Sequence, residues 1–200
     1  MKLSRFTYRF LVLLTRIALF FWHPVFRVRG RENIPEGPCV IAGNHSGNAD
    51  PLWDIYALRP MPLYRILAKE SLLRVPVLRI LFERIGMIGV RRGEQDVGAL
   101  KTCLHALKNG EKVFIYPEGT RVKKERMEAK TGALMLAERA GVPVLPVYTS
   151  RRRFPFQPVL VSIGEPFRVR SEGRRATAAE LRKQTDEMMD RIYAMGGDRA

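Results

Sequence analysis

Beyond residue 38, short apolar runs alternate with longer amphipathic stretches, and this alternation restricts the fold more than any other feature of the chain. The runs are rich in Val and Ile and too short for helices, so they are predicted to be buried strands. Six strands are predicted, at residues 39–42, 64–68, 87–90, 112–116, 142–147 and 159–163. Strands that alternate with helices favour an α/β fold, with a mostly parallel central sheet covered by helices. Functional sites in such folds lie at the carboxyl ends of the strands.

The stretches between these runs carry helix signals. Apolar residues at helical spacing predict helices at residues 52–58, 97–107 and 131–140, and in the C-terminal tail through Ile192. Gly110 and Gly141 are placed to end the second and third of these helices. Thr177 and Glu180 form a capping-box pattern that opens the tail helix.

Size and cysteine usage narrow the class of protein. The 200 residues are 46% hydrophobic and 28% charged, which suits one domain with a substantial core. Cys39 and Cys103 both lie in apolar settings without CxxC spacing, which favours a reducing compartment over a disulfide framework. No cluster of acids and histidines has metal-ligand spacing, so no metal site is expected.

The chain is strongly basic. Its 35 Lys and Arg residues against 20 acids give a net charge of +15, and no acid precedes Glu32. Further basic clusters lie at residues 121–126, 151–153 and 168–175. Such a charge suits nucleic acid, an anionic membrane or an acidic carrier protein, and charge alone does not choose among them.

The N-terminus favours the membrane. Residues 10–22 are apolar apart from Arg16 and a threonine, and this stretch is shorter than the roughly 20 apolar residues of a membrane-spanning helix. A secretory signal is the competing interpretation, although no small-residue cleavage site follows; an ordinary core helix is another. Aromatic residues at 20–22 beside basic ones favour a helix that lies in the membrane interface. We therefore predict an interfacial anchoring helix at residues 1–26, followed by the α/β domain at residues 27–200.

Residues 72–84 form a second candidate membrane contact. Apolar residues there follow helical spacing, and Pro76 suits a first helical turn. A helix packed on the sheet explains this pattern. Arg74 and Arg79 interleave with the apolar residues, however, which also suits a helix that dips into lipid headgroups.

A candidate base follows the first predicted strand. Of the three histidines, His45 is the one with an acid, Asp50, placed to orient it. Imidazole can take a proton from a hydroxyl near neutral pH, and a carboxylate can fix its tautomer and stabilise the cation formed. Asp50 also precedes Pro51 and a predicted helix, and taken alone this pattern favours a helix N-cap over a catalytic acid; the two roles are compatible.

A candidate anion site follows two other predicted strands. Gly119 frees the backbone for close approach to a ligand, and Arg121 can bind a phosphate through two hydrogen bonds. Arg92 follows residues 87–90 in the same way. Solvated surface charge is the alternative for each basic residue taken alone. Two such sites at one sheet edge favour a shared anion pocket beside the base, and hence proton abstraction from a phosphate-bearing alcohol.

Four blocks of the chain resemble the PlsC-like glycerolipid acyltransferases, over about residues 27–164. His45-x-x-x-x-Asp50 resembles the catalytic motif of that family. The other three blocks lie at residues 86–92, 116–121 and 141–147. The first block alone is a weak signal, whereas four blocks in the right order are highly specific.

The resemblance implies transfer of a fatty acyl group from acyl-CoA or acyl carrier protein to a lysophospholipid, by default the sn-2 hydroxyl of lysophosphatidic acid, without cofactor or metal. It implies that His45 is the base and Asp50 its partner. It also implies a peripheral protein on the cytoplasmic face of the cell membrane. The implied phosphate-binding residues are Lys69, Arg92, Glu118, Gly119, Thr120 and Arg121.

Two departures from the family pattern leave the acceptor open. Gly47 stands where many members have serine, and Arg91 where many have Asp or Asn. Another lysolipid, such as an amino-acid-containing one, is therefore the alternative acceptor. A basic nucleic-acid-binding protein is the alternative from a different class. The chain has no RNP, zinc or helix-turn-helix signature, so no nucleic-acid partner is expected.

Overall fold

The computed structural model describes residues 10, 13–14, 17, 19–58, 64–70, 87–90, 96–122, 127–151, 154 and 156–197. Within these ranges one sheet contains the strands β1 (Phe26–Arg29), β2 (Val40–Gly43), β3 (Tyr64–Lys69), β4 (Met87–Val90), β5 (Lys112–Ile115), β6 (Val144–Thr149) and β7 (Val159–Ile163). The helices are η1 (Arg31–Asn33), α2 (Asp50–Ala57), α4 (Val97–Lys108), α5 (Gly132–Ala140) and α6 (Ala178–Ala194).

The sheet is mostly parallel, as predicted. Its strand order is β1-β7-β6-β2-β5-β3-β4, and the five strands from β6 to β4 are parallel to one another. β7 is antiparallel to β6, and β1 is parallel to β7. The carboxyl ends of β2, β5 and β6 therefore share one edge of the sheet with the amino ends of β7 and β1. We call this edge the catalytic edge, because the candidate base follows β2 there.

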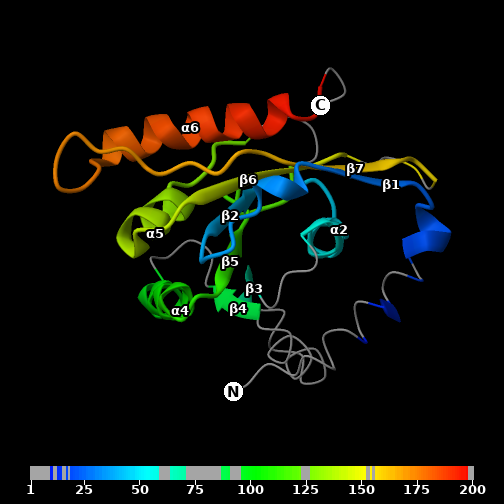
Figure 1. Ribbon diagram of the computed structural model, residues 1–200, viewed down its shortest axis with the longest axis horizontal. Helices are drawn as coiled ribbons and strands as arrows, with labels where there is room; N and C mark the ends of the chain where they lie inside the picture. The colour runs from blue at the N-terminus through cyan, green and yellow to red at the C-terminus, as the bar shows by residue number, and fades with distance from the viewer. Residues whose placement is uncertain are drawn as a thin grey trace.

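Helices cover both faces of the sheet (Figure 1). α4, α5 and α6 pack on one face, in a core that includes Leu107, Leu134 and Met188. α2 packs on the other face through Trp53 and Tyr56. In β2, Val40 and Ala42 belong to one core and Ile41 to the other, and all four residues of the strand are buried. Burial on both faces is the reason that the central strands read as continuous apolar runs.

The six predicted strands correspond to β2 to β7, and β1 was missed. β1 is the outermost strand of the sheet and pairs with β7 alone, with Phe26 opposite Val159. Its residues alternate between half-buried and exposed, so Arg27 and Arg29 point to solvent and interrupt the apolar signal. Four residues of alternation are too few to predict a strand from sequence.

The predicted helix ends are confirmed for α5 and α6. Gly141 follows α5 with φ 67°, the left-handed conformation that suits glycine at this position. At α6, the Thr177 hydroxyl accepts from the backbone N–H of Glu180, and the Glu180 carboxylate accepts from the N–H of Thr177 at 2.6 Å. These reciprocal bonds are the predicted capping box.

The prediction that Asp50 is the N-cap of α2 was wrong. Ala49 is the N-cap, and Asp50 is already the first helical residue. Its carboxylate turns back and accepts from the backbone N–H groups of Ser46 and Gly47, both at 2.6 Å. The acid therefore satisfies donors of the loop before the helix.

The two cysteines lie on opposite faces of the sheet. Cys39 belongs to the core under α2 and Cys103 to the core under α4, and both are free. Burial raises the pKa of Cys39 to about 11 and that of Cys103 to about 12. Both thiols therefore stay protonated at neutral pH and serve as small core side chains.

The described residues of the stretch 10–22 have helical backbone, as predicted. Leu19 packs against the core under α2, whereas Leu13, Ile17 and the aromatic side chains of residues 20–22 are exposed. Its position in a membrane interface stays a prediction. Among the described residues, the structure contains no helix with the length and hydropathy to span a bilayer. Residues 72–84, the second predicted membrane contact, lie outside the described residues.

Candidate active site

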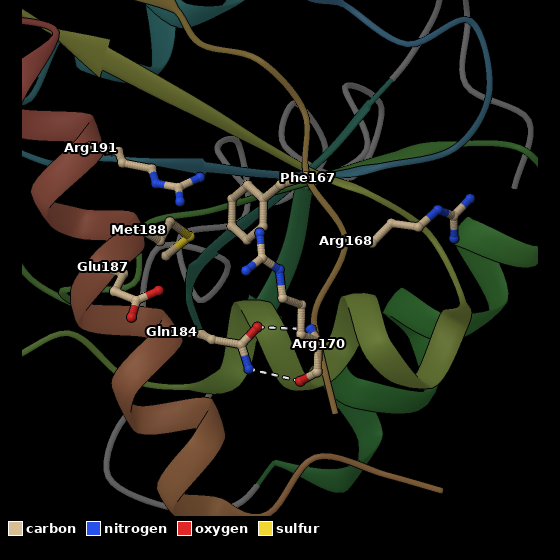
Figure 2. A pocket seen from close by; sticks show the side chains of 7 residues that line it. All are labelled: Phe167, Arg168, Arg170, Gln184, Glu187, Met188 and Arg191. Carbon is tan, nitrogen blue, oxygen red and sulfur yellow. Dashed lines mark hydrogen bonds between the residues drawn. The ribbon is translucent and has the colours of Figure 1, made fainter. Parts of the chain in front are cut away.

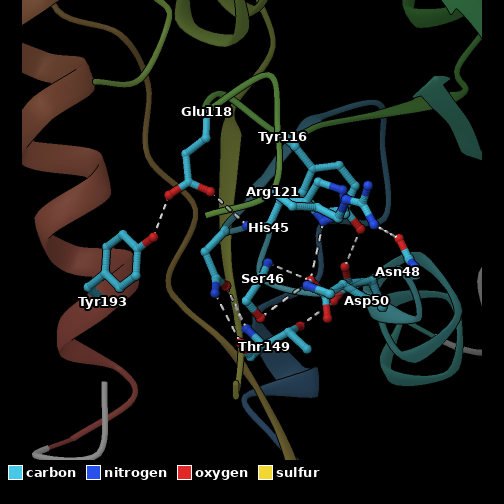
Figure 3. Close-up of polar contacts among 12 residues, drawn as sticks. His45, Ser46, Asn48, Asp50, Tyr116, Glu118, Arg121, Thr149 and Tyr193 are labelled. Carbon is cyan, nitrogen blue, oxygen red and sulfur yellow. Dashed lines mark hydrogen bonds and ion pairs between the residues drawn. The ribbon is translucent and has the colours of Figure 1, made fainter. Parts of the chain in front are cut away.

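Two loops that follow β2 and β5 are bonded to each other at the catalytic edge (Figure 3). The backbone N–H of Val122 donates to the carbonyl of His45 at 2.8 Å. The N–H of His45 donates to Glu118 Oε2, also at 2.8 Å. The loop that carries the predicted base and the turn that carries the predicted anion site are thus held together, although 73 residues separate His45 from Glu118.

His45 and Asp50 are in contact, with 3.2 Å between His45 Nδ1 and Asp50 Oδ2. An ionised carboxylate can only accept a hydrogen bond, so this contact places the imidazole proton on Nδ1. Nε2 is left with a lone pair. The His45 side chain is 14% exposed and that of Asp50 is fully buried, so the imidazole is open to a ligand while the carboxylate is sealed from water.

The buried Asp50 carboxylate is stabilised by the loop around it. Besides His45, its Oδ2 accepts from the backbone N–H groups of Ser46 and Gly47. The Ser46 hydroxyl lies at 3.5 Å from the same oxygen. A buried charge needs such donors, and bonds to an ionised acceptor are stronger than neutral ones. The small residues between His45 and Asp50 let the chain turn tightly enough to supply them.

The imidazole is also held from its face. Tyr116 stacks on His45 with 4.3 Å between ring centroids and 21° between the ring planes. The Tyr116 hydroxyl donates to Asp54 Oδ2 at 2.7 Å, and the Thr149 hydroxyl donates to Asp54 Oδ1 at 2.5 Å. Asp54 is itself buried on α2. One carboxylate therefore fixes the ring that supports the base.

Asn44 joins the carboxyl ends of β2 and β6. Its amide donates to the carbonyl of Thr149 at 3.0 Å, and the N–H of Thr149 donates to Asn44 Oδ1 at 2.8 Å. The sequence predicted no catalytic or ligand-binding role for Asn44, Asp54, Tyr116 or Thr149. A carboxylate on the apolar side of a short helix was a usable signal for Asp54, because a buried acid needs a partner.

The turn after β5 has the shape that its glycine predicted. Gly119 adopts φ 66°, in the left-handed region, and its N–H donates to the carbonyl of Tyr116 at 2.9 Å. The Glu118 side chain points inward and is 3% exposed. One of its oxygens accepts from the His45 N–H and the other from the hydroxyl of Tyr193 on α6. Glu118 thus joins His45, the turn and the C-terminal helix.

Arg121 lies beside the loop that carries His45. Its guanidinium is exposed and donates through Nη1 to Asn48 Oδ1, as Figure 3 shows. Thr120 is half-buried in the same turn. Lys69 ends β3, whose carboxyl end shares the catalytic edge, but its side chain lies outside the described residues, as does the whole of Arg92. Phosphate binding by these residues stays a prediction.

A surface pocket between α6 and the chain after β7 lies at the opposite edge of the sheet (Figure 2). Phe167 lines this pocket and pairs with Val144, the first residue of β6, whereas the base lies near the last residues of that strand. Arg168 and Arg191 also line it, and Arg191 lies 5.7 Å from the centre of the Phe167 ring. The pocket is therefore separate from the site that contains His45.

Comparison with known proteins shows that the chain is similar to acyltransferases. Residues 25–150 match the family model described as Acyltransferase. A 1-acyl-sn-glycerol-3-phosphate acyltransferase of Pseudomonas aeruginosa is 33% identical over 201 residues, which cover 93% of this chain and 74% of that protein. The chloroplast 1-acyl-sn-glycerol-3-phosphate acyltransferase of Brassica napus is 34% identical over 126 residues. That match covers 60% of this chain and 36% of the plant protein, so the chain spans about a third of that relative.

A solved structure shares the fold. The crystal structure of the 1-acyl-sn-glycerophosphate acyltransferase PlsC from Thermotoga maritima matches with a TM-score of 0.66 at 26% sequence identity. The match covers 92% of this chain and 77% of the other. The family model covers more than half of the chain and includes His45, Asp50 and the turn at residues 116–121. The chain therefore belongs to the acyltransferase family.

Proposed function

We propose that this protein transfers a fatty acyl group from acyl-CoA or acyl carrier protein to the sn-2 hydroxyl of lysophosphatidic acid, giving phosphatidic acid. The contact between His45 and Asp50 carries this proposal, because it orients a base with a free nitrogen at the catalytic edge. Relatives named 1-acyl-sn-glycerol-3-phosphate acyltransferases support the choice of acceptor. The reaction needs the acyl thioester as co-substrate and no cofactor.

The proposed reaction is a direct attack without an acyl-enzyme. His45 Nε2 takes the proton of the acceptor hydroxyl while its oxygen attacks the thioester carbonyl carbon. The tetrahedral intermediate then collapses, the C–S bond breaks, and the departing thiolate takes the proton from the imidazolium. Asp50 stabilises that imidazolium through Nδ1–H. General-base help contributes about 10²- to 10⁴-fold, so alignment of the two substrates supplies much of the remaining rate.

The acceptor phosphate is proposed to bind beside Arg121. Its exposed guanidinium is tied to Asn48 in the loop that carries His45, so a bound phosphate would place the lipid close to the base. Arg92 and Lys69 are proposed to complete this site, together with the backbone at Gly119 and Thr120. The carboxylate of Glu118 would repel a phosphate, so we assign Glu118 the positioning of His45 through its backbone N–H.

The protein is proposed to act at the cytoplasmic face of the cell membrane as a peripheral protein. The lipid acceptor resides in a bilayer, and the described residues near the N-terminus expose apolar side chains. The net charge of +15 suits anionic lipid headgroups and also either acidic acyl donor.

Product mass spectrometry tests the proposed function. The purified protein is incubated with a panel of lysolipids, including lysophosphatidic acid and an amino-acid-containing lysolipid, and with acyl-CoA or acyl carrier protein as donor. We expect the mass of one acyl group to be added to lysophosphatidic acid. Faster acylation of another lysolipid would replace the acceptor, and no acylated product with any pair would refute the proposed reaction.

Arg121→Gln is expected to raise the KM for lysophosphatidic acid by about 10- to 100-fold, because a charge-assisted hydrogen bond to phosphate is worth about 1.5–3 kcal/mol. The kcat should change little, since the contact between His45 and Asp50 is untouched. Initial rates over a range of acceptor concentrations give both constants. Arg121→Lys should restore part of the affinity, and Arg174→Gln, at an exposed arginine before α6, is the control. An unchanged KM in Arg121→Gln would remove Arg121 from the phosphate site.

Tyr193→Phe is expected to lower kcat by about 3- to 10-fold, because it removes a hydrogen bond from a buried carboxylate that positions His45. The KM for the acceptor should stay near the wild-type value. Tyr148→Phe is the matched control, because Tyr148 packs near the same end of α6, against Gly196. Steady-state kinetics and thermal unfolding of both variants separate the two roles. Equal loss of kcat in both would assign Tyr193 to general stability.

A further inference from the structure

Among the described residues six large aromatic side chains are exposed, and the five that are exposed most lie at two places in the chain. Phe20, Phe21 and Trp22 belong to the N-terminal helical stretch, and Phe154 and Phe156 belong to the connection between β6 and β7. Each is at least 59% exposed. Soluble proteins rarely gather large apolar side chains on their surface without a binding role. We call these five residues the aromatic patch.

The two parts of the aromatic patch are physically joined. The N–H of Phe156 donates to the carbonyl of Trp22 at 2.8 Å. One residue further along each segment, His23 Nδ1 and the carbonyl of Gln157 lie 2.9 Å apart, and His23 is buried with its ring edge-on to Trp53. The two segments that carry the aromatic rings are therefore bonded to each other at this point.

Phe156 is held in an unfavourable backbone conformation. Its φ is 65°, and it is the one non-glycine residue with positive φ in the part of the chain that the structure describes. This conformation costs free energy for a bulky residue. Packing does little to offset that cost, since Phe156 is 69% exposed. Folding stability alone thus gives no reason for phenylalanine at this position.

The two segments that carry the aromatic patch contain basic residues and no acidic ones. No acidic residue precedes Glu32, and none lies between Ser150 and Gly164. Arg151 is exposed at the start of the β6–β7 connection, and the next two residues in the sequence are also arginines. Aromatic rings beside basic side chains suit the boundary between lipid headgroups and acyl chains of an anionic bilayer.

The topology puts the aromatic patch on the catalytic edge. Thr149, which bonds to Asn44 and Asp54 of the site, is the last residue of β6, and the β6–β7 connection begins at the next residue. The N-terminal stretch enters the sheet at the amino end of β1, which lies at this same edge. Figure 1 shows the start of β1 and the β6–β7 connection at the same end of the sheet.

We propose that the β6–β7 connection is a membrane-docking element, which inserts Phe154 and Phe156 into an anionic lipid bilayer beside the N-terminal aromatic residues. Arg151 contributes attraction to anionic headgroups. Docking by these two segments lays the catalytic edge against the bilayer that contains the lipid acceptor. Only this last consequence rests on the proposed function; the docking itself does not.

Vesicle flotation of the full-length protein tests the proposal. The vesicles are phosphatidylcholine with about one third phosphatidylglycerol, and phosphatidylcholine alone. The double variant Phe154→Ala/Phe156→Gly should lower the partition coefficient on the mixed vesicles by about tenfold or more, because each buried ring adds apolar contact with lipid. Because glycine accepts a positive φ, the midpoint of thermal unfolding should be unchanged or higher. A loss of binding without a loss of stability is the expected signature.

Arg151→Gln should weaken binding to the mixed vesicles about fivefold and leave binding to phosphatidylcholine alone unchanged. Arg174→Gln is the matched control, because it removes an equal charge from an exposed arginine before α6, outside the catalytic edge. If both substitutions weakened binding equally, Arg151 would act only through the net charge of the protein, and its role in docking would be overturned.

The docking proposal would be overturned if the phenylalanine double variant bound the mixed vesicles as tightly as the wild type. It would also be overturned if this variant kept its vesicle binding and lost only its retention of DNA in a filter-binding assay. Acyl transfer to acceptor dispersed in detergent micelles separates this outcome from failure of the proposed function. The phenylalanine variant should keep wild-type turnover in micelles. His45→Ala should float with vesicles like the wild type. A wild-type protein that floats but transfers no acyl group would refute the reaction and leave the docking surface in place.

Discussion

Replacing His45 by alanine is expected to lower kcat by about 10²- to 10⁴-fold, the range that a positioned general base contributes. The variant loses the one group in the described site that has an unprotonated nitrogen held by a buried acid. The KM for lysophosphatidic acid should change by less than about threefold, because Arg121 and the turn at Gly119 remain. Initial rates with acyl-CoA and lysophosphatidic acid, at saturating concentrations of each, measure the loss.

His105→Ala is the matched control for this variant. His105 is exposed on α4 and its ring bonds to Asn109 one turn later, away from the two loops of the site. Its replacement should leave both kinetic constants unchanged. Thermal unfolding of His45→Ala should stay close to wild type, because the side chain is partly exposed and its backbone contacts to Glu118 and Val122 persist. Wild-type turnover in His45→Ala would disprove the mechanism.

The central sheet was predictable because its strands are buried on both faces. β2 and β6 contribute side chains to both cores, so their sequences are apolar throughout and stand out against polar loops. β1 was not predictable for the opposite reason: Arg27 and Arg29 face solvent, and the pairing with β7 is made across more than 130 residues. The antiparallel β7 has the same apolar composition as its parallel neighbours, so its direction was not readable either.

The contact between His45 and Asp50 was predictable because the two residues are only five positions apart. His45 and Asp50 lie in one loop, and spacing within a loop limits where two side chains can point. Contacts between residues that are far apart in the sequence left no comparable pattern in the sequence. Tyr193 reaches Glu118 from a helix 75 residues later, where its spacing from neighbouring apolar residues looks like ordinary core packing. Thr149 reaches Asp54 from the end of another strand.

The error at Asp50 has a physical origin. Asp followed by Pro before a helical stretch is a strong cap signal, since aspartate accepts from helix N–H groups and proline needs no partner there. The loop before α2 offers competing donors, the backbone N–H groups of Ser46 and Gly47. The Asp50 carboxylate accepts from these groups. Sequence alone cannot rank two sets of backbone donors that compete for one acid. The orientation that results is the one that serves His45.

Asp50→Asn is expected to lower kcat by up to about 10⁴-fold, the loss that the same change causes at the acid of a Ser-His-Asp triad. Asparagine has the same shape as aspartate, and its carbonyl oxygen can still accept from the N–H groups of Ser46 and Gly47. It cannot offer a negative charge to the imidazolium that forms on His45 during the reaction. The KM for the acceptor should therefore stay near wild type while kcat falls, and the free energy of unfolding should fall by about 1–3 kcal/mol.

Asp96→Asn provides the matched comparison and shows why the two positions should differ. Asp96 caps α4 and accepts from the backbone N–H of Ala99 at 2.9 Å, a bond that an asparagine cap makes equally well. Its replacement should leave kcat and the unfolding midpoint close to wild type. At Asp50 one oxygen of a fully buried carboxylate accepts from two backbone N–H groups and an imidazole, so the charge itself is required. Should the two variants lose kcat equally, Asp50 would be a structural acid, and the reaction would depend on His45 without a charged partner.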